Sequence, residues 1–238
     1  MNDRKATQDV RLRFRALCAM PLLLGASIAH ADVSNCGNPF VNHFGPWDYR
    51  IASVADKTIV ERTHFTSETE QLKPNSGTGY PAQDIGYTLR VFPNHPRALL
   101  AMSRLALKEK TAVPKHGDMS VDCYFDRAMR FTPNDPEVYM IYGVHVMKTG
   151  DNKTAIALLE KASSLDDSNA NVHYNLGLAY FEVKNYDKSL AEATKAYALG
   201  FPLPGLRNML EKAGKWRPPD GSTGATQAAT PEAAAPKN

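Results

Sequence analysis

The chain has 238 residues, 43% of them hydrophobic, and a formal net charge of +3, which is ordinary for a globular protein of one or two domains. The first 31 residues contain five basic and two acidic side chains and so account for the whole net charge. Because the remainder is formally neutral, charge gives no reason to expect nucleic acid or an anionic membrane as a partner.

The first 31 residues have the pattern of a secretory signal peptide. Their basic side chains precede an apolar stretch, and Ala29-His30-Ala31 follows as a cleavage site. The apolar stretch has 14 residues and contains Pro21 and Gly25, whereas about 20 residues are needed to span a bilayer. Cleavage is therefore favoured over the alternative of an uncleaved membrane anchor. We expect a periplasmic or secreted protein with no integral membrane segment after cleavage.

Cleavage would leave two cysteines, Cys36 and Cys123. An oxidising compartment would allow them to pair, and closing a loop of that length would contribute about 4 kcal/mol in the chain-entropy model. The alternative is two separate thiols, one in a loop and one buried on a helix. The sequence does not fix the distance between them, so both arrangements stay open at this point.

Residues 32–79 are predicted to form an irregular N-terminal segment. Aromatic residues and prolines crowd into its first part without helical periodicity. These aromatic side chains either bury against the first helices or present an apolar patch to a partner. A short helix is predicted near Ser67, because Ser67-Glu-Thr-Glu70 has the form of a capping box.

The strongest signal in the chain is a repeat of 34 residues. Under that shift Gly143 falls on Gly177 and Ala162 on Ala196. An earlier copy begins its first helix near Pro96 and carries six extra residues, in the stretch 111–118 between its two helices. Small residues at fixed spacing allow two antiparallel helices to approach closely, while large residues fill the space between one hairpin and the next.

These residues resemble the tetratricopeptide repeat (TPR), a hairpin with Leu-Gly and Tyr in helix A and small residues in helix B. The best match is His173-Tyr-Asn-Leu-Gly-Leu-Ala-Tyr180, followed by Asn185-Tyr-Asp-Lys-Ser-Leu. The previous copy departs from the pattern at Val146, where Tyr is usual, and at Asp167, where Pro is usual. The resemblance implies an all-α fold, a TPR-type α-α superhelix of about three helical hairpins.

Flanking helices complete the array, which we expect over residues 80–216. Residues 84–96 align with residues 124–136 at a shift of 40 and predict a lone helix B that caps the start, and residues 203–216 predict a closing helix. Parts of both flanks are similar to exported proteobacterial TPR proteins of unassigned function. This similarity implies no activity. Residues 217–238 are rich in Ala, Thr, Pro and Gly, so we expect a disordered tail.

No pattern in the chain indicates catalysis, a cofactor or a metal. The six histidines after the signal segment are scattered singly, and His145 and His173 fall in repeat helices, where helix packing explains them. There is no Gly-rich phosphate loop, no nucleophile elbow and no paired-carboxylate arrangement. We therefore expect a protein that is not an enzyme and takes no cofactor.

A partner-binding groove is implied by the resemblance, because helix A forms most of the concave wall in this family. Its outward positions would suit an extended or helical peptide with apolar anchors and an acidic end. The alternative is that the N-terminal segment or the closing helix covers several of them. The predicted groove residues are Arg97, Arg104, Lys108, Met140, Val144, Met147, Tyr174, Asn175, Leu178 and Phe181.

Three functions are compatible with these features. The first is an adaptor or scaffold that binds a protein or peptide partner whose identity the sequence does not give. The second is a binding protein for glycan or peptidoglycan fragments, with aromatic side chains as stacking platforms. The third is a redox or metal-handling factor built on the two cysteines. The platforms of the second function would be Trp47, Tyr49, Tyr174 and Phe181.

Overall fold

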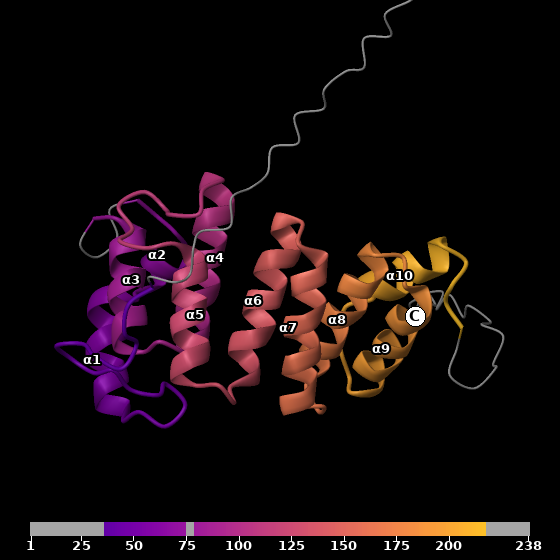
Figure 1. Ribbon diagram of the computed structural model, residues 1–238, viewed down its shortest axis with the longest axis horizontal. Helices are drawn as coiled ribbons and strands as arrows, with labels where there is room; N and C mark the ends of the chain where they lie inside the picture. The colour runs from indigo at the N-terminus through magenta and orange to yellow at the C-terminus, as the bar shows by residue number, and fades with distance from the viewer. Residues whose placement is uncertain (1–35, 75–78, 218–238) are drawn as a thin grey trace, which may run out of the picture. The chain divides into compact units, whose positions relative to one another are not determined.

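The computed structural model describes residues 36–74 and 79–217, and in this part of the chain it contains ten α-helices and no strand (Figure 1). The prediction of an all-α fold is confirmed. The predicted signal peptide and nearly all of the predicted tail lie outside the described residues. The helices are α1 (Val54–His64), α2 (Ser67–Glu70), α3 (Pro81–Val91), α4 (Pro96–Glu109), α5 (Val121–Phe131), α6 (Pro136–Thr149), α7 (Asn152–Leu165), α8 (Ala170–Glu182), α9 (Tyr186–Ala198) and α10 (Gly205–Lys212).

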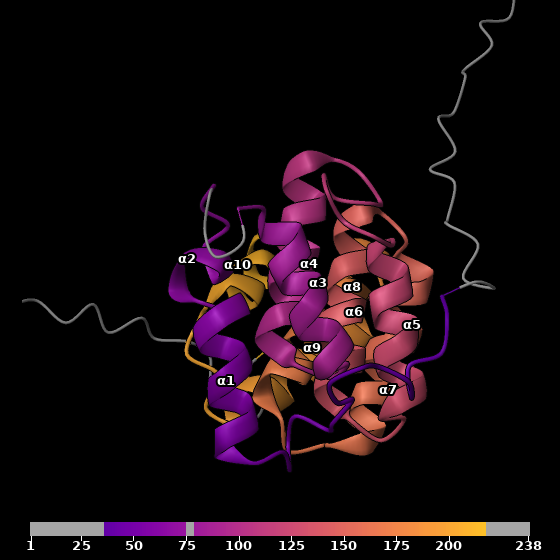
Figure 2. The same ribbon diagram turned by 90° about the vertical axis from the view of Figure 1, so that its left-hand side faces the viewer.

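Helices α4 to α9 form three consecutive hairpins, α4 with α5, α6 with α7 and α8 with α9. Each hairpin contacts the next through α4 and α6 or through α7 and α8. Helix α3 packs against α4 in the place predicted for a lone helix B, and α10 packs against α8 and α9 as the closing helix (Figures 1 and 2). The A helices of the three copies are therefore α4, α6 and α8.

The first two A helices begin in the same way. Each has a proline at its first position, Pro96 in α4 and Pro136 in α6, where the missing N–H has no helical acceptor to lose. The preceding residues, His95 and Asp135, accept a hydrogen bond from a backbone N–H of the first turn, at 3.2 Å in both helices. The same local chemistry thus starts both hairpins in the same orientation.

Two glycines allow the close helix contacts on which the hairpins depend. A β-carbon on Gly143 would lie 2.7 Å from Cγ of Leu159, in the partner helix of the same hairpin. A β-carbon on Gly177 would lie 2.5 Å from Cδ2 of Leu206, in the closing helix. At Gly143 an alanine would therefore collide with Leu159. At Gly177 the end of the Leu206 side chain can move, and the tighter limit within the hairpin is the backbone carbonyl of Ser189 in α9, 3.3 Å from such a β-carbon.

The hydrophobic core continues from one hairpin to the next. One cluster of buried side chains joins α3, α4, α5 and the start of α6. Met140 contacts this cluster and also a second one, formed by Leu159 with residues of α8. A third cluster joins α9 to α10 around Leu206 and Leu210. No hairpin buries its apolar residues alone, as expected for a repeat array.

The N-terminal segment is more regular than its sequence indicated. Residues 36–53 are irregular, but α1 and α2 follow them. Helix α1 buries only Val60, so it has no apolar stripe from which a helical period could be read. The short helix near Ser67 is confirmed, although the side chain that caps it is Thr66, which accepts a hydrogen bond from the N–H of Thr69 at 3.3 Å.

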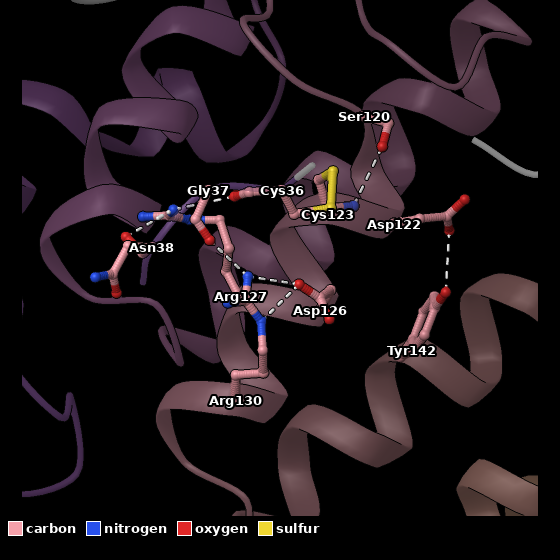
Figure 3. Close-up of a disulfide and its surroundings, with 10 residues drawn as sticks. All are labelled: Cys36, Gly37, Asn38, Ser120, Asp122, Cys123, Asp126, Arg127, Arg130 and Tyr142. Atoms are coloured by element: carbon pink, nitrogen blue, oxygen red, sulfur yellow. Dashed lines mark hydrogen bonds and ion pairs between the residues drawn. A yellow bond between two sulfur atoms is a disulfide. The ribbon is translucent and has the colours of Figure 1, made fainter. Parts of the chain in front are cut away.

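A disulfide joins Cys36 to Cys123 in the first turn of α5 (Figure 3). Of the two arrangements that the sequence left open, pairing is the one present. Arg127 and Arg130, further along α5, donate hydrogen bonds to the backbone carbonyls of Cys36 at 3.2 Å and Gly37 at 2.8 Å. The start of the N-terminal segment is therefore held on α5 both covalently and by charged donors.

Removing this disulfide should destabilise the fold. The two cysteines are 87 residues apart, so we expect Cys36→Ser with Cys123→Ser to lower the free energy of unfolding by about 4 kcal/mol. Urea denaturation of the chain from residue 32 onward measures this, and the wild type under strong reductant is the control, which should unfold like the variant. Two free thiols in the oxidised wild type, found by thiol titration after unfolding, would contradict the assignment.

Candidate functional site

The outward residues of α4, α6 and α8, which we call the A-helix face, include every predicted groove residue. They form three groups, one on each helix, and the group on α4 differs from the other two in exposure. Arg97, Arg104 and Lys108 are exposed on α4. Met140, Val144 and Met147 are half-buried on α6, and the four residues of α8 are half-buried as well.

Arg97 is occupied by the N-terminal segment. Its guanidinium forms an ion pair with Glu70 of α2, with 2.8 Å between Nε and Oε1. It also lies over the ring of Phe65, 5.4 Å from the ring centroid. The hydrogen bond from Arg97 holds the pKa of Glu70 below its ordinary value. One of the three predicted cations is thus already paired within the chain.

The other cations surround an open hollow. Arg104 and Lys108 of α4 and Lys148 of α6 line it together with Leu72 and Leu107. All three cations are exposed, and none of them forms an ion pair within residues 36–74 and 79–217. Lys148 also lines the hollow, because α6 packs beside α4. The sequence alone does not show that these two helices are in contact, so Lys148 is not among the predicted groove residues.

The groove residues of α8 are covered by the closing helix. Tyr174, Leu178 and Phe181 pack against the cluster around Leu206 of α10. The ring of Tyr174 stacks on Phe201 at 3.9 Å. For these three residues the alternative of coverage by the closing helix is the arrangement found. The fourth residue, Asn175, donates a hydrogen bond to a backbone carbonyl of its own helix at 2.8 Å.

The groove residues of α6 lie at a boundary between hairpins. Met140 and Met147 pack against the cluster that contains Leu159 of α7 and Tyr180 of α8, and they remain partly exposed. A methionine there can adapt its shape to a bound side chain, because its thioether chain is flexible. The part of the A-helix face that remains open runs over α4 and α6.

The aromatic residues proposed as glycan platforms are half-buried and pack against other side chains of the fold. Trp47 lies edge to face with Phe44 at 4.8 Å and close to Phe92 at 5.9 Å. Tyr49 donates a hydrogen bond from its hydroxyl to Glu61 of α1 at 2.7 Å. With Tyr174 covered by the closing helix, these rings stabilise the fold. They therefore give no support to the glycan alternative.

Three histidines of the described residues are buried, His95, His145 and His173, and each is held by a hydrogen bond. His95 is fully buried, with its Nε2 3.3 Å from Glu61 while its Nδ1 caps α4. His145 of α6 lies 2.9 Å from the hydroxyl of Ser103. Burial lowers the pKa of the His95 and His145 imidazoles, and the hydrogen bond from His95 lowers the pKa of Glu61 to about 2.

Folding also brings together two histidines that the sequence keeps far apart. His64 and His116 line one polar hollow beside α3, and Nδ1 of His64 lies 2.9 Å from the buried carboxylate of Asp84. Within the described residues, however, no three side chains of His, Cys, Asp or Glu are placed to hold a metal ion. No helix of the described part is both long and apolar enough to cross a membrane.

Comparison with known proteins agrees with the repeat geometry. The family model described as TPR repeat matches residues 146–184, from the end of α6 through α7 and α8. This part of the chain therefore contains a tetratricopeptide repeat. Proteins built from this repeat are typically non-enzymatic scaffolds for protein–protein interaction. No curated protein matches the sequence.

Three solved structures are similar to this chain at low sequence identity. Two crystal structures of MamA have TM-scores of 0.44 and 0.47 at 17% and 18% identity. They cover 68% and 66% of this chain and 86% and 82% of their own. A thermophilic TPR protein of Thermus thermophilus, TTC0263, has a TM-score of 0.42 at 20% identity and covers 57% of this chain and 74% of its own.

The buried histidines predict a loss of stability in mild acid. Because burial lowers the pKa of His95 and His145 in the folded protein, the unfolded chain binds protons first as pH falls below about 6.5. The free energy of unfolding should therefore be highest near pH 7 and should fall toward pH 5, by up to about 1.4 kcal/mol per pH unit for each proton.

Urea denaturation at a series of pH values checks this expectation. His95→Asn keeps an acceptor at the start of α4 and removes one titrating group, so its pH slope should be shallower than that of the wild type. His43→Asn changes an exposed histidine of the irregular segment and serves as the control. Equal slopes for the wild type and His95→Asn would contradict the role given to His95.

Proposed function

We propose that this TPR protein is an exported scaffold that binds an acidic polypeptide segment with aliphatic side chains on the open part of its A-helix face. The observation that carries the proposal is the hollow between α4 and α6. There Arg104, Lys108 and Lys148 gather around Leu72 and Leu107, and none of the three cations forms an ion pair within the described part of the chain.

The charge of this hollow selects the kind of partner. A single exposed ion pair is worth only about 0–1 kcal/mol, but three cations around one depression attract an acidic segment and reject a basic one. The half-buried side chain of Leu107 offers apolar contact between the charges. A segment that carries Glu or Asp together with Leu or Ile satisfies both kinds of contact.

Charge reversal at the hollow tests this proposal. The probes are fluorescein-labelled peptides that contain Glu and Leu, with a second set that carries Gln in place of Glu. Arg104→Glu with Lys108→Glu should weaken binding of the Glu peptide at least tenfold, because two attractive contacts become repulsive. Fluorescence anisotropy of the chain from residue 32 onward measures the affinity.

A matched charge reversal away from the hollow is the control. Lys153→Glu with Lys212→Glu changes the net charge equally, at exposed positions of α7 and α10, and should leave the affinity within about twofold of the wild type. Binding of the Glu and Gln peptides with equal strength would remove the electrostatic argument. So would equal loss of affinity in the two double variants.

Export is the second element of the proposal. It is supported by the N-terminal sequence pattern and by the disulfide, because disulfides persist in oxidising compartments. The full chain produced in bacteria should appear in the periplasm with Asp32 as its first residue, as measured by fractionation and mass spectrometry. Ala31→Arg should block cleavage and leave the precursor in the membrane fraction. An uncut wild-type chain in the cytoplasm would refute export.

A further inference from the structure

Helix α2 and the residue that follows it lie on the A-helix face as a short segment of acid and aliphatic character. Glu70 forms an ion pair with Arg97, and Arg104 also acts on the Glu70 carboxylate through its charge. Two residues later, Leu72 lines the basic hollow beside Leu107. The chain thus already places a carboxylate and an aliphatic side chain on the surface that the proposed function assigns to a partner.

The polar contact that holds this segment on α4 is open to solvent. The side chains of Arg97 and Glu70 are 50% and 32% exposed, and water and salt weaken an ion pair at such exposure. Leu72 has a φ of 60°, a left-handed conformation that a leucine adopts only when neighbouring contacts impose it. Helix α2 has four residues, too few to be stable without those contacts.

Release of the segment uncovers buried positions. Thr69 is fully buried, and Leu72 is 8% exposed and belongs to the core cluster that joins α3, α4, α5 and α6, so a competitor has to fill the place of Leu72 with an apolar side chain of its own. The tether keeps the segment at a high local concentration near the A-helix face. A competitor therefore has to make more contacts than the segment makes. The cations Lys108 and Lys148, which form no ion pair within residues 36–74 and 79–217, provide them.

We propose that residues 66–72 are a built-in pseudo-ligand of the A-helix face, and that a partner segment with an acidic residue two positions before an aliphatic one displaces them. This inference rests on the proposed function and defines its partner more narrowly. The partner's acid takes the place of Glu70 beside Arg97, its aliphatic residue takes the place of Leu72, and further acids reach Lys108 and Lys148.

Weakening the pseudo-ligand should strengthen binding in trans. The probe is a labelled peptide that carries the pattern Glu-Gln-Leu twice, separated by two residues. Glu70→Gln removes the competing carboxylate and should raise the affinity of the chain for this peptide about three- to tenfold. Glu68→Gln is the matched control, because Glu68 lies on the same helix and forms no ion pair within the described residues.

Hydrogen exchange supplies a second readout that does not depend on a variant. The amides of Glu70, Gln71 and Leu72 donate within the α2 turn, and saturating peptide should speed their exchange in the wild type if the segment is released. If neither the wild type nor Glu70→Gln binds the peptide, the proposed function itself is contradicted. Equal binding by both, with exchange at these amides unchanged or slowed, would overturn only the pseudo-ligand.

Discussion

The close approach of neighbouring helices at glycine is the constraint on which the rest of this structure depends. With no side chain at Gly143 and Gly177, Leu159 and Leu206 fill the space that a β-carbon would take. Hairpins joined this closely share their cores across α6, α7 and α8. Helix α6 also packs beside α4, and Lys148 lines the same hollow as Arg104.

Local chemistry made the repeat array predictable from the sequence, whereas the site depends on contacts between segments far apart. The 34-residue spacing and the prolines at 96 and 136 mark the A helices directly. Helix α1 left no signal because it buries a single residue. The pairing of Arg97 with Glu70 and the coverage of Tyr174 depend on how both ends of the chain fold back onto the array. The spacing of residues along the sequence does not predict such contacts.

Different A helices are covered by α10 and by α2, and this decides which predicted groove residues stay open. Helix α10 packs against Tyr174 and Phe181 of α8 in the same way that a further repeat would, so these half-buried rings serve the stability of the array. At the other end, α2 covers part of α4 and leaves Arg104 and Lys108 open. The open part of the A-helix face therefore lies over the first two hairpins, although the third copy matches the repeat pattern best.

The N-terminal segment combines one firm attachment with one weak one. At Cys36 it is bonded covalently to α5, and the aromatic residues around Trp47 pack on the buried Phe92. At α2 the polar contact with the A-helix face is an ion pair open to solvent. Release of α2 therefore leaves the rest of the segment on the array, and the segment can return when the partner leaves. A covalent anchor far from the site and a weak contact at the site together permit exchange without unfolding.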